Sequence, residues 1–281
     1  MDSIEGTRDM NSELDPGAET VMAPWLADTF DDFVAFLRHQ AEFVRVVHWS
    51  LYRTMHRLSL VRALEDLDTP DEEETAQRKQ ERDERIASAE TQAAFAFSEV
   101  ESDYCTLHSQ GLVMVWSALN ALIDDLVRTC LSNHPSLLES DSLSKLKIPL
   151  SAAIGSSEED RLDRLFEAVE REVTKGEGVN HFESLLVVVN LSGATEVSLK
   201  DDLYILQKVR NLLAHRRGYV DRRFIRACPS LDSTLGERLI IDLDMYLRLA
   251  TAAVNYAGVV KERARYEYGV PRTEPEGAGS T

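Results

Sequence analysis

The chain has 281 residues, a net charge of −18 and an apolar fraction of 43%. It is long enough to bury a core, and its composition is typical of a soluble protein whose acidic surface repels polyanions. Three cysteines without a CxxC pair argue against a disulfide framework or a thiolate zinc site, and the N-terminus lacks the pattern of a signal peptide. No run approaches the roughly 20 apolar residues of a membrane span. We therefore expect a cytoplasmic protein that does not enter a membrane.

The two ends of the chain are polar. Residues 1–22 are acidic and include a Pro-Gly pair, and residues 269–281 are rich in proline and glycine. Such segments bury too little apolar surface to offset the entropy lost on ordering. We predict disordered tails at both ends.

Apolar residues recur at three- and four-residue steps from Phe30 to Leu58 and predict a long amphipathic helix, which Pro70 interrupts. Residues 71–85 are almost wholly charged and predict a solvent-exposed helix that carries both acidic and basic side chains. We assign residues 23–100 to an N-terminal helical extension. It lacks residues typical of catalysis, and we expect it to support the following domain or to recognise a regulatory protein partner.

The remaining domain, residues 101–268, shows the same helical periodicity. One apolar stripe covers residues 112–126, and Pro135 marks its end. Another covers residues 158–175, behind a Gly-Ser-Ser segment at 155–157 that can cap the helix. These features predict two more amphipathic helices.

The last third of the chain continues this pattern. Residues 185–191 form a short apolar run that fits a buried helix turn or a strand, and periodicity does not decide between them. Ser198 is a candidate N-cap for the next helix, and Gly218 is a candidate stop signal. A final helix is expected within residues 236–268. The apolar faces of these two helices are predicted to be Leu203, Leu206, Val209 and Leu213, and then Leu243, Leu247, Ala250 and Val254. The predicted fold is all-α, a helical bundle with a long N-terminal amphipathic helical extension.

A basic segment interrupts this acidic chain. Residues 208–226 include seven cationic side chains and one acidic side chain, Asp221. The segment therefore carries a local charge of +6 within a chain of net charge −18. It is the one segment of the sequence whose local charge favours the binding of a phosphate. The seven are Lys208, Arg210, Arg216, Arg217, Arg222, Arg223 and Arg226.

Three polar residues in this segment have the chemistry for RNA cleavage. The imidazole of His215 can accept and return a proton, and the guanidinium of Arg210 can bind a phosphate and stabilise its developing charge. Asn211 and His215 are four residues apart and share a helix face, whereas Arg210 lies about 140° away from His215 in an ideal helix. Arg210 must therefore curl toward that face if the two are to act together.

A purely structural interpretation explains the same residues. Lysine, arginine and histidine in the last turn of a helix oppose its dipole favourably, and a glycine commonly follows as the stop. On this interpretation the segment is simply a well-terminated helix.

The motif Arg210-Asn211-Leu-Leu-Ala-His215, behind an amphipathic helix and before a glycine, resembles the signature of the HEPN superfamily. The helix around Trp116-Ser-Ala-Leu-Asn is similar to the first core helix of those domains. The resemblance spans roughly residues 105–266 and is specific over 205–219. Among superfamily members, the chain is most similar to RiboL-PSP-type and defence-associated domains.

The resemblance implies a HEPN-like helical domain that forms a homodimer, with two such helices facing each other across a cleft. Active members are metal-independent endoribonucleases that leave a 2′,3′-cyclic phosphate, and Arg210 and His215 match their catalytic pair. Asn211 matches the polar residue that often follows the arginine. Some members carry a tyrosine two residues after the histidine, where this chain has Arg217. Other members are non-catalytic modules for dimerisation or partner binding.

Two acidic residues and the remaining histidines complete the candidate list. Asp124 and Asp125 are candidates to orient His215 or to pair with Arg210. A solvent-facing acidic pair is the favoured explanation, because only one of two neighbouring residues can face inward. His39, His48 and His56 lack the HxxxH or HExxH spacing of a metal site. We predict neither a metal nor a cofactor.

The sequence thus favours a metal-independent endoribonuclease that acts as a toxin or antiviral defence effector. Its predicted catalytic residues are Arg210, His215 and Asn211, and its predicted partners are RNA and a second copy of the chain. The side chains expected to guide the RNA backbone are Lys208, Arg216, Arg217, Arg222 and Arg223. The alternative is a non-catalytic helical module that uses the same helix for dimerisation or partner binding.

Overall fold

The computed structural model describes residues 20–67, 76–140, 143, 157–174 and 176–271, and within these residues the fold is all-α apart from one short strand pair. Strands β1 (Thr20–Val21) and β2 (Val270–Pro271) pair antiparallel and join the two ends of the helical region. The predicted all-α class is confirmed. Most of the two predicted tails, and Pro70, lie outside the described residues.

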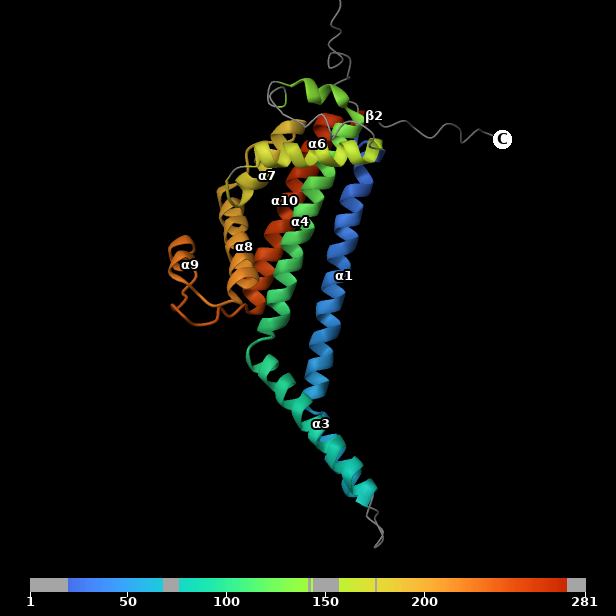
Figure 1. The fold of residues 1–281 in the computed structure, drawn as a ribbon, viewed down its shortest axis with the longest axis vertical. Coiled ribbons are helices and arrows are strands. Elements are labelled where there is room, and N and C mark those ends of the chain that lie inside the picture. Colours follow the sequence, from blue (N-terminus) through green and yellow to red (C-terminus); the bar gives the residue numbers. More distant parts are fainter. Residues whose placement is uncertain (1–19, 68–75, 141–142, 144–156, 175, 272–281) are drawn as a thin grey trace, which may run out of the picture.

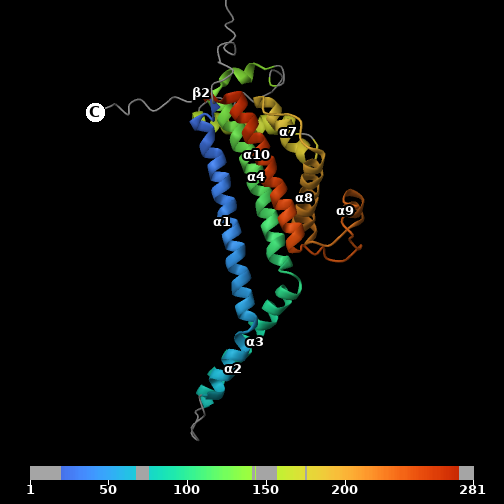
Figure 2. The same ribbon diagram turned by 180° about the vertical axis from the view of Figure 1, so that it is seen from behind.

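The N-terminal helices build one side of the bundle and an arm that extends beyond it. Helix α1 (Pro24–Met55) runs beside α4, and α2 (Arg57–Leu67) and α3 (Ala76–Glu101) continue away from the bundle (Figures 1 and 2). The predicted stripe from Phe30 to Leu58 is thus divided, because the chain breaks at His56 between α1 and α2. Ion pairs Arg62–Glu90 and Arg85–Glu65 join the two helices of the arm. From Ala76 onward the charged stretch is the exposed helix that its composition predicts.

Helix α4 (Cys105–Asn133) is the centre of the molecule, and α10 (Leu243–Tyr268) runs along it. Figure 2 shows α8 (Val197–Arg216) on the far side of this pair from α1. The helices approach closely at Gly111, where an added Cβ would lie 2.7 Å from Cε2 of Tyr246. The fully buried side chains of α4 include Leu112, Leu119, Ile123 and Leu126.

By length and composition alone, α4 is also apolar enough to cross a membrane, and half of its most apolar window is buried by the other helices.

Shorter elements close the end of the bundle away from the arm. A 3-10 turn η1 (Pro135–Glu139) follows α4, and α6 (Glu158–Val173) crosses the upper ends of α4 and α10 (Figure 1). Helix α7 (Val179–Leu186) continues into the 3-10 turn η2 (Val187–Val189), so the ambiguous apolar run is helical rather than a strand. The 3-10 geometry explains why its periodicity was uninformative, since the side chains of such a turn repeat every three residues.

Helix caps confirm some sequence predictions and correct others. Ser157 caps α6 in a reciprocal capping box with Asp160, as expected. Ser198 is not the N-cap of α8, which begins two residues earlier behind Glu196. The Ser198 hydroxyl instead donates a hydrogen bond of 2.8 Å to the Glu196 carboxylate. An anion at this position also suits the helix dipole.

The predicted apolar face of α10 is wrong. Leu243, Leu247 and Val254 are 39%, 50% and 48% exposed. The helix has apolar residues on more than one face, so periodicity alone does not identify the packed one. The face that packs on the bundle carries Tyr246, Leu249, Ala253, Tyr256 and Val260. For α8 the predicted face is confirmed at Leu203, Leu206 and Val209, and Leu213 is half-buried.

A charged network ties α7 to α10 near the end of the bundle. The Glu183 carboxylate accepts hydrogen bonds from Arg263 and from the Tyr256 hydroxyl, both at 2.8 Å, and from the backbone N–H of Gly193 at 2.9 Å. Burial tends to raise the pKa of Glu183, but these hydrogen bonds outweigh it and hold the pKa below its usual value. The carboxylate is thus ionised and fully partnered at neutral pH.

We predict that Glu183→Gln lowers the free energy of unfolding by about 2–3 kcal/mol at pH 7, because Arg263 loses its buried counter-charge. The difference should shrink as the pH falls below about 4.3. There the wild-type carboxylate is protonated as the pH passes through its lowered pKa, and its contribution to stability is lost. Urea unfolding at pH 7 and pH 3 measures both effects. The control is Glu262→Gln at an exposed ion pair, which should cost less than about 1 kcal/mol; an equal loss in both variants contradicts the account.

Candidate functional site

The end of α8 is where the sequence motif meets the surface. Arg216 is the last helical residue, Arg217 takes a left-handed conformation with φ of 56°, and Gly218 follows at φ of 82°. The backbone N–H groups of Arg217 and Gly218 both point to the carbonyl of Leu212, which closes the helix. The stop signal predicted at Gly218 is therefore shared with the arginine before it, although a non-glycine residue adopts this conformation at some cost.

The chain then folds back so that a short helix stands beside α8. Helix α9 (Arg222–Ala227) begins at Asp221, whose carboxylate accepts a hydrogen bond of 2.8 Å from the Phe224 N–H. Figure 1 shows α9 next to the arm-side end of α8. Phe224 of α9 is buried, and it is among the residues that line the space between the two helices. The space between the two helices is a pocket of about 370 Å³.

This pocket collects five of the predicted site residues. Asn211 and His215, four residues apart on α8, line it as their shared helix face predicts, and His215 is exposed. The other three, Lys208, Arg216 and Arg223, give the pocket its positive charge. Asp221 is the only acid among the lining residues. The structure thus brings these five residues together around one concave surface.

Two of these cations already have partners within the chain. Lys208 is mostly buried and forms an ion pair with Glu177, which follows α6 in the sequence, and its ammonium group lies over the Tyr204 ring. Arg216 lies 3.6 Å from the Asp221 carboxylate. Exposed pairs of this kind are worth little and open easily, whereas the buried Lys208 is held in place. Arg223 has no ion pair among the described residues.

Arg210 does not line the pocket. Its Nη1 donates a hydrogen bond of 3.1 Å to the Asn211 side-chain oxygen, and its Nε is buried without a hydrogen-bond partner in the described part of the chain. A buried guanidinium nitrogen without a partner is costly and uncommon. Within one chain, Arg210 and His215 thus remain on different faces of α8, as the ideal helix predicts.

The remaining predicted residues lie elsewhere. Arg217 faces a different cavity, and Arg222 lines neither that cavity nor the α8–α9 pocket. Asp124 and Asp125 form no hydrogen bond or ion pair with Arg210 or His215 among the described residues. Burial and the nearby Glu170 raise the pKa of Asp124 to about 7, against the opposing effect of Arg128. Asp124 therefore belongs to the contact between α4 and α6.

Sequence reasoning missed the residues that reach the site from a distance. Glu177 is about thirty positions from Lys208, and no local pattern indicates that the two pair. The position of Phe224, in contrast, can be predicted from the sequence. An aspartate three residues before a buried aromatic, just after a glycine stop, is an N-cap signal for a new helix packed against the last one.

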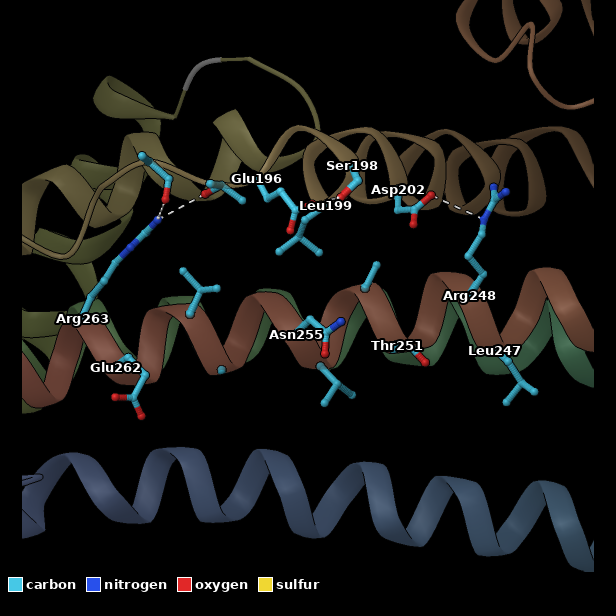
Figure 3. Close-up of a pocket in the computed structure, with 16 residues that line it drawn as sticks. Glu196, Ser198, Leu199, Asp202, Leu247, Arg248, Thr251, Asn255, Glu262 and Arg263 are labelled. Atoms are coloured by element: carbon cyan, nitrogen blue, oxygen red, sulfur yellow. Dashed lines mark hydrogen bonds and ion pairs between the residues drawn. The ribbon is translucent and has the colours of Figure 1, made fainter.

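A hollow larger than the α8–α9 pocket lies away from the motif. A groove of about 1170 Å³ separates α8 from α10 (Figure 3). Both of its arginines are already paired: Arg248 Nε lies 3.4 Å from Asp202, and Arg263 binds Glu183 and the Ala194 carbonyl. The groove is thus crossed by structural contacts, which distinguishes it from the pocket at His215.

Comparison with known proteins gives no independent assignment: no family model matches the chain, and neither a curated protein nor a solved structure is found to be similar to it. Any statement about activity therefore depends on the residues and geometry described above.

The raised pKa of Asp124 makes a prediction about pH. The neutral carboxyl is favoured in the folded state, so its contribution is present below the unfolded pKa of about 3.9 and is lost as the pH rises through about 7. Asp124→Asn, which cannot ionise, should gain about 1–2 kcal/mol of stability relative to wild type between pH 4 and pH 8. Urea unfolding across this range tests it. The exposed Asp201→Asn is the control, and a difference for Asp124→Asn that does not change with pH contradicts the assignment.

Proposed function

We propose that the protein is a metal-independent endoribonuclease of HEPN type that acts as a cytoplasmic toxin or antiviral defence effector. The observation that carries the proposal is the pocket between α8 and α9, where Asn211 and the exposed His215 lie among Lys208, Arg216 and Arg223. A histidine side chain in a concave basic surface of an otherwise acidic chain offers the proton-transfer and phosphate-binding groups that RNA cleavage needs.

The proposed reaction uses the RNA as its own nucleophile. The 2′-hydroxyl attacks the adjacent phosphorus, an imidazole takes its proton, and the bond from phosphorus to the 5′-oxygen breaks. A second acid returns a proton to that leaving oxygen. The products are a 2′,3′-cyclic phosphate and a 5′-hydroxyl, and no water or metal is consumed. Arg210 stabilises the charge on the phosphoryl oxygens, and Asn211 positions Arg210 or the substrate.

A homodimer resolves the geometry of this site. Arg210 and His215 occupy different faces of one helix, so a single chain does not direct both side chains into one pocket. Two copies of α8 that face each other across a cleft supply two histidines, one as base and one as acid.

The charge distribution supports an RNA substrate that binds at only one part of the protein surface. The segment from Lys208 to Arg226 carries +6 within a chain of −18, so phosphates are attracted to one strip and repelled elsewhere. Arg223 and Arg222 on α9 extend the strip beyond the pocket, and we propose that they guide the RNA backbone. The acidic remainder limits non-specific RNA binding.

A second candidate function is a non-catalytic module for dimerisation or partner binding. The contacts of Lys208 with Glu177 and of Arg216 with Asp221 favour it, because they use two of the basic side chains within the chain itself. On this view the cations stabilise the end of α8 and its contact with α9.

Cleavage of mixed RNA in the presence of EDTA distinguishes the two functions. The nuclease should release fragments with cyclic-phosphate ends. His215→Ala should lower the rate by about 10²–10⁴-fold, and Arg210→Ala by about 10²–10³-fold. His56→Ala, which removes an exposed histidine at the far end of α1, is the matched control and should retain the wild-type rate.

The result must be accompanied by circular dichroism and by the oligomeric state of each variant. Cleavage that survives in His215→Ala, or that depends on the metal, contradicts the proposed chemistry. A folded wild-type dimer that leaves RNA intact favours the binding module instead.

A further inference from the structure

A second cavity lies on the side of α8 that faces away from His215. It has a volume of about 760 Å³ and is lined by α1, α4, the last turn of α8 and Arg238. Leu213 of α8 also lines this cavity, and because consecutive helix residues are about 100° apart it lies about 200° around the helix from His215. This cavity is therefore separate from the pocket between α8 and α9, and its size is within the range of small-molecule sites.

The walls of the cavity are rich in large apolar side chains. Phe36 and Phe43 from α1 and Met114 from α4 all line it, and they are 36%, 50% and 40% exposed. Exposed apolar side chains scattered singly need no explanation, but a group of them around one hollow is a feature of binding sites. Two aromatic rings with a methionine nearby favour a planar apolar ligand, since rings stack and sulfur packs well at ring edges.

The charged residues of the cavity are all basic. Arg217 and Arg238 line it together with His39, and the lining contains no aspartate or glutamate. Neither arginine forms an ion pair within the described residues, unlike Arg248 and Arg263 in the larger groove. In a chain of net charge −18, two unpaired guanidinium groups beside an apolar hollow are not explained by folding alone. They provide the charge complement of an anion.

The two arginines are positioned by the backbone. Arg217 sits at the left-handed end of α8, and Arg238 is in the strand-like segment that returns past it. Tyr219 and Arg238 form an antiparallel bridge, and the Leu239 N–H donates to the Gly218 carbonyl at 2.9 Å. These bonds fix the chain at both guanidinium-bearing positions.

Polar groups suited to fixing a ligand's orientation also line the cavity. The side-chain amides of Gln40 on α1 and Gln110 on α4 line the cavity, and neither forms a hydrogen bond within the described part of the chain. Small-molecule sites commonly combine apolar walls with a few such groups.

We propose that this cavity binds a small aromatic anion, with its ring body against Phe36, Phe43 and Met114 and its anionic group paired with Arg217 and Arg238. The site shares neither His215 nor Asn211 with the proposed nuclease pocket, and Arg217, which was predicted to guide RNA, lines this cavity instead of that pocket. Its ligand is a planar apolar ring system that carries a phosphate, sulfonate or carboxylate.

The test uses two fluorescent probes that differ only in charge. 8-Anilinonaphthalene-1-sulfonate has the aromatic body and one sulfonate, and N-phenyl-1-naphthylamine has the same body without it. We expect saturable binding of one sulfonate probe per chain, at least about tenfold tighter than the neutral probe. Arg238→Gln should remove most of that difference. Arg217→Asn should do the same, and asparagine tolerates the left-handed backbone at that position.

Arg226→Gln, an exposed arginine on α9 that does not line the cavity, is the matched control and should bind both probes as wild type does. Thermal melts establish that each variant is folded, since partly unfolded chains also bind such probes. Equal affinity for the two probes, binding without a defined stoichiometry, or unchanged sulfonate binding in folded Arg238→Gln overturns the proposal.

Discussion

The burial of α4 is the constraint on which the rest of the structure depends. Its middle turns are covered on several sides, and α1, α8 and α10 each place an apolar face against it. Gly111 lets Tyr246 approach closely where α10 runs along α4, and α1 and α8 lie on opposite sides of this helix pair. This arrangement holds the end of α8 in a fixed position. One face of that end contributes to the His215 pocket, and the other contributes to the cavity that contains Arg217 and Arg238.

Local sequence signals predicted the helices well, because a helix is specified mainly by residues close in the chain. Patterns of three to four residues predict the all-α fold class and the capping of α6 at Ser157. They also predict the buried face of α8, which carries Leu203, Leu206 and Val209. The errors are of two kinds. Ser198 was assigned as a cap from its residue type, although Glu196 begins the helix. The face of α10 was misassigned because apolar residues occupy more than one side of that helix, and only the neighbouring helices determine which side is buried.

The candidate site shows the same division between local and distant information. Asn211 and His215 could be placed on one face of one helix from their spacing alone, and they share a pocket. Their surroundings could not be predicted in the same way. Glu177, Arg238 and Phe36 reach the end of α8 from other elements, and no periodicity in the sequence connects them with it. The separation of Arg210 from His215 was foreseeable from helix geometry, and it makes a second chain central to the functional proposal.

That dependence on two chains can be tested by complementation. Arg210→Ala and His215→Ala chains carrying different affinity tags are co-expressed, and the mixed dimer is isolated by tandem purification. A composite site predicts that the mixed dimer, with one intact Arg210 and one intact His215 on separate chains, cleaves RNA measurably faster than either mutant homodimer. A mixed dimer confirmed by native mass spectrometry that is no more active than the two homodimers, beside an active wild type, would contradict a site shared between chains.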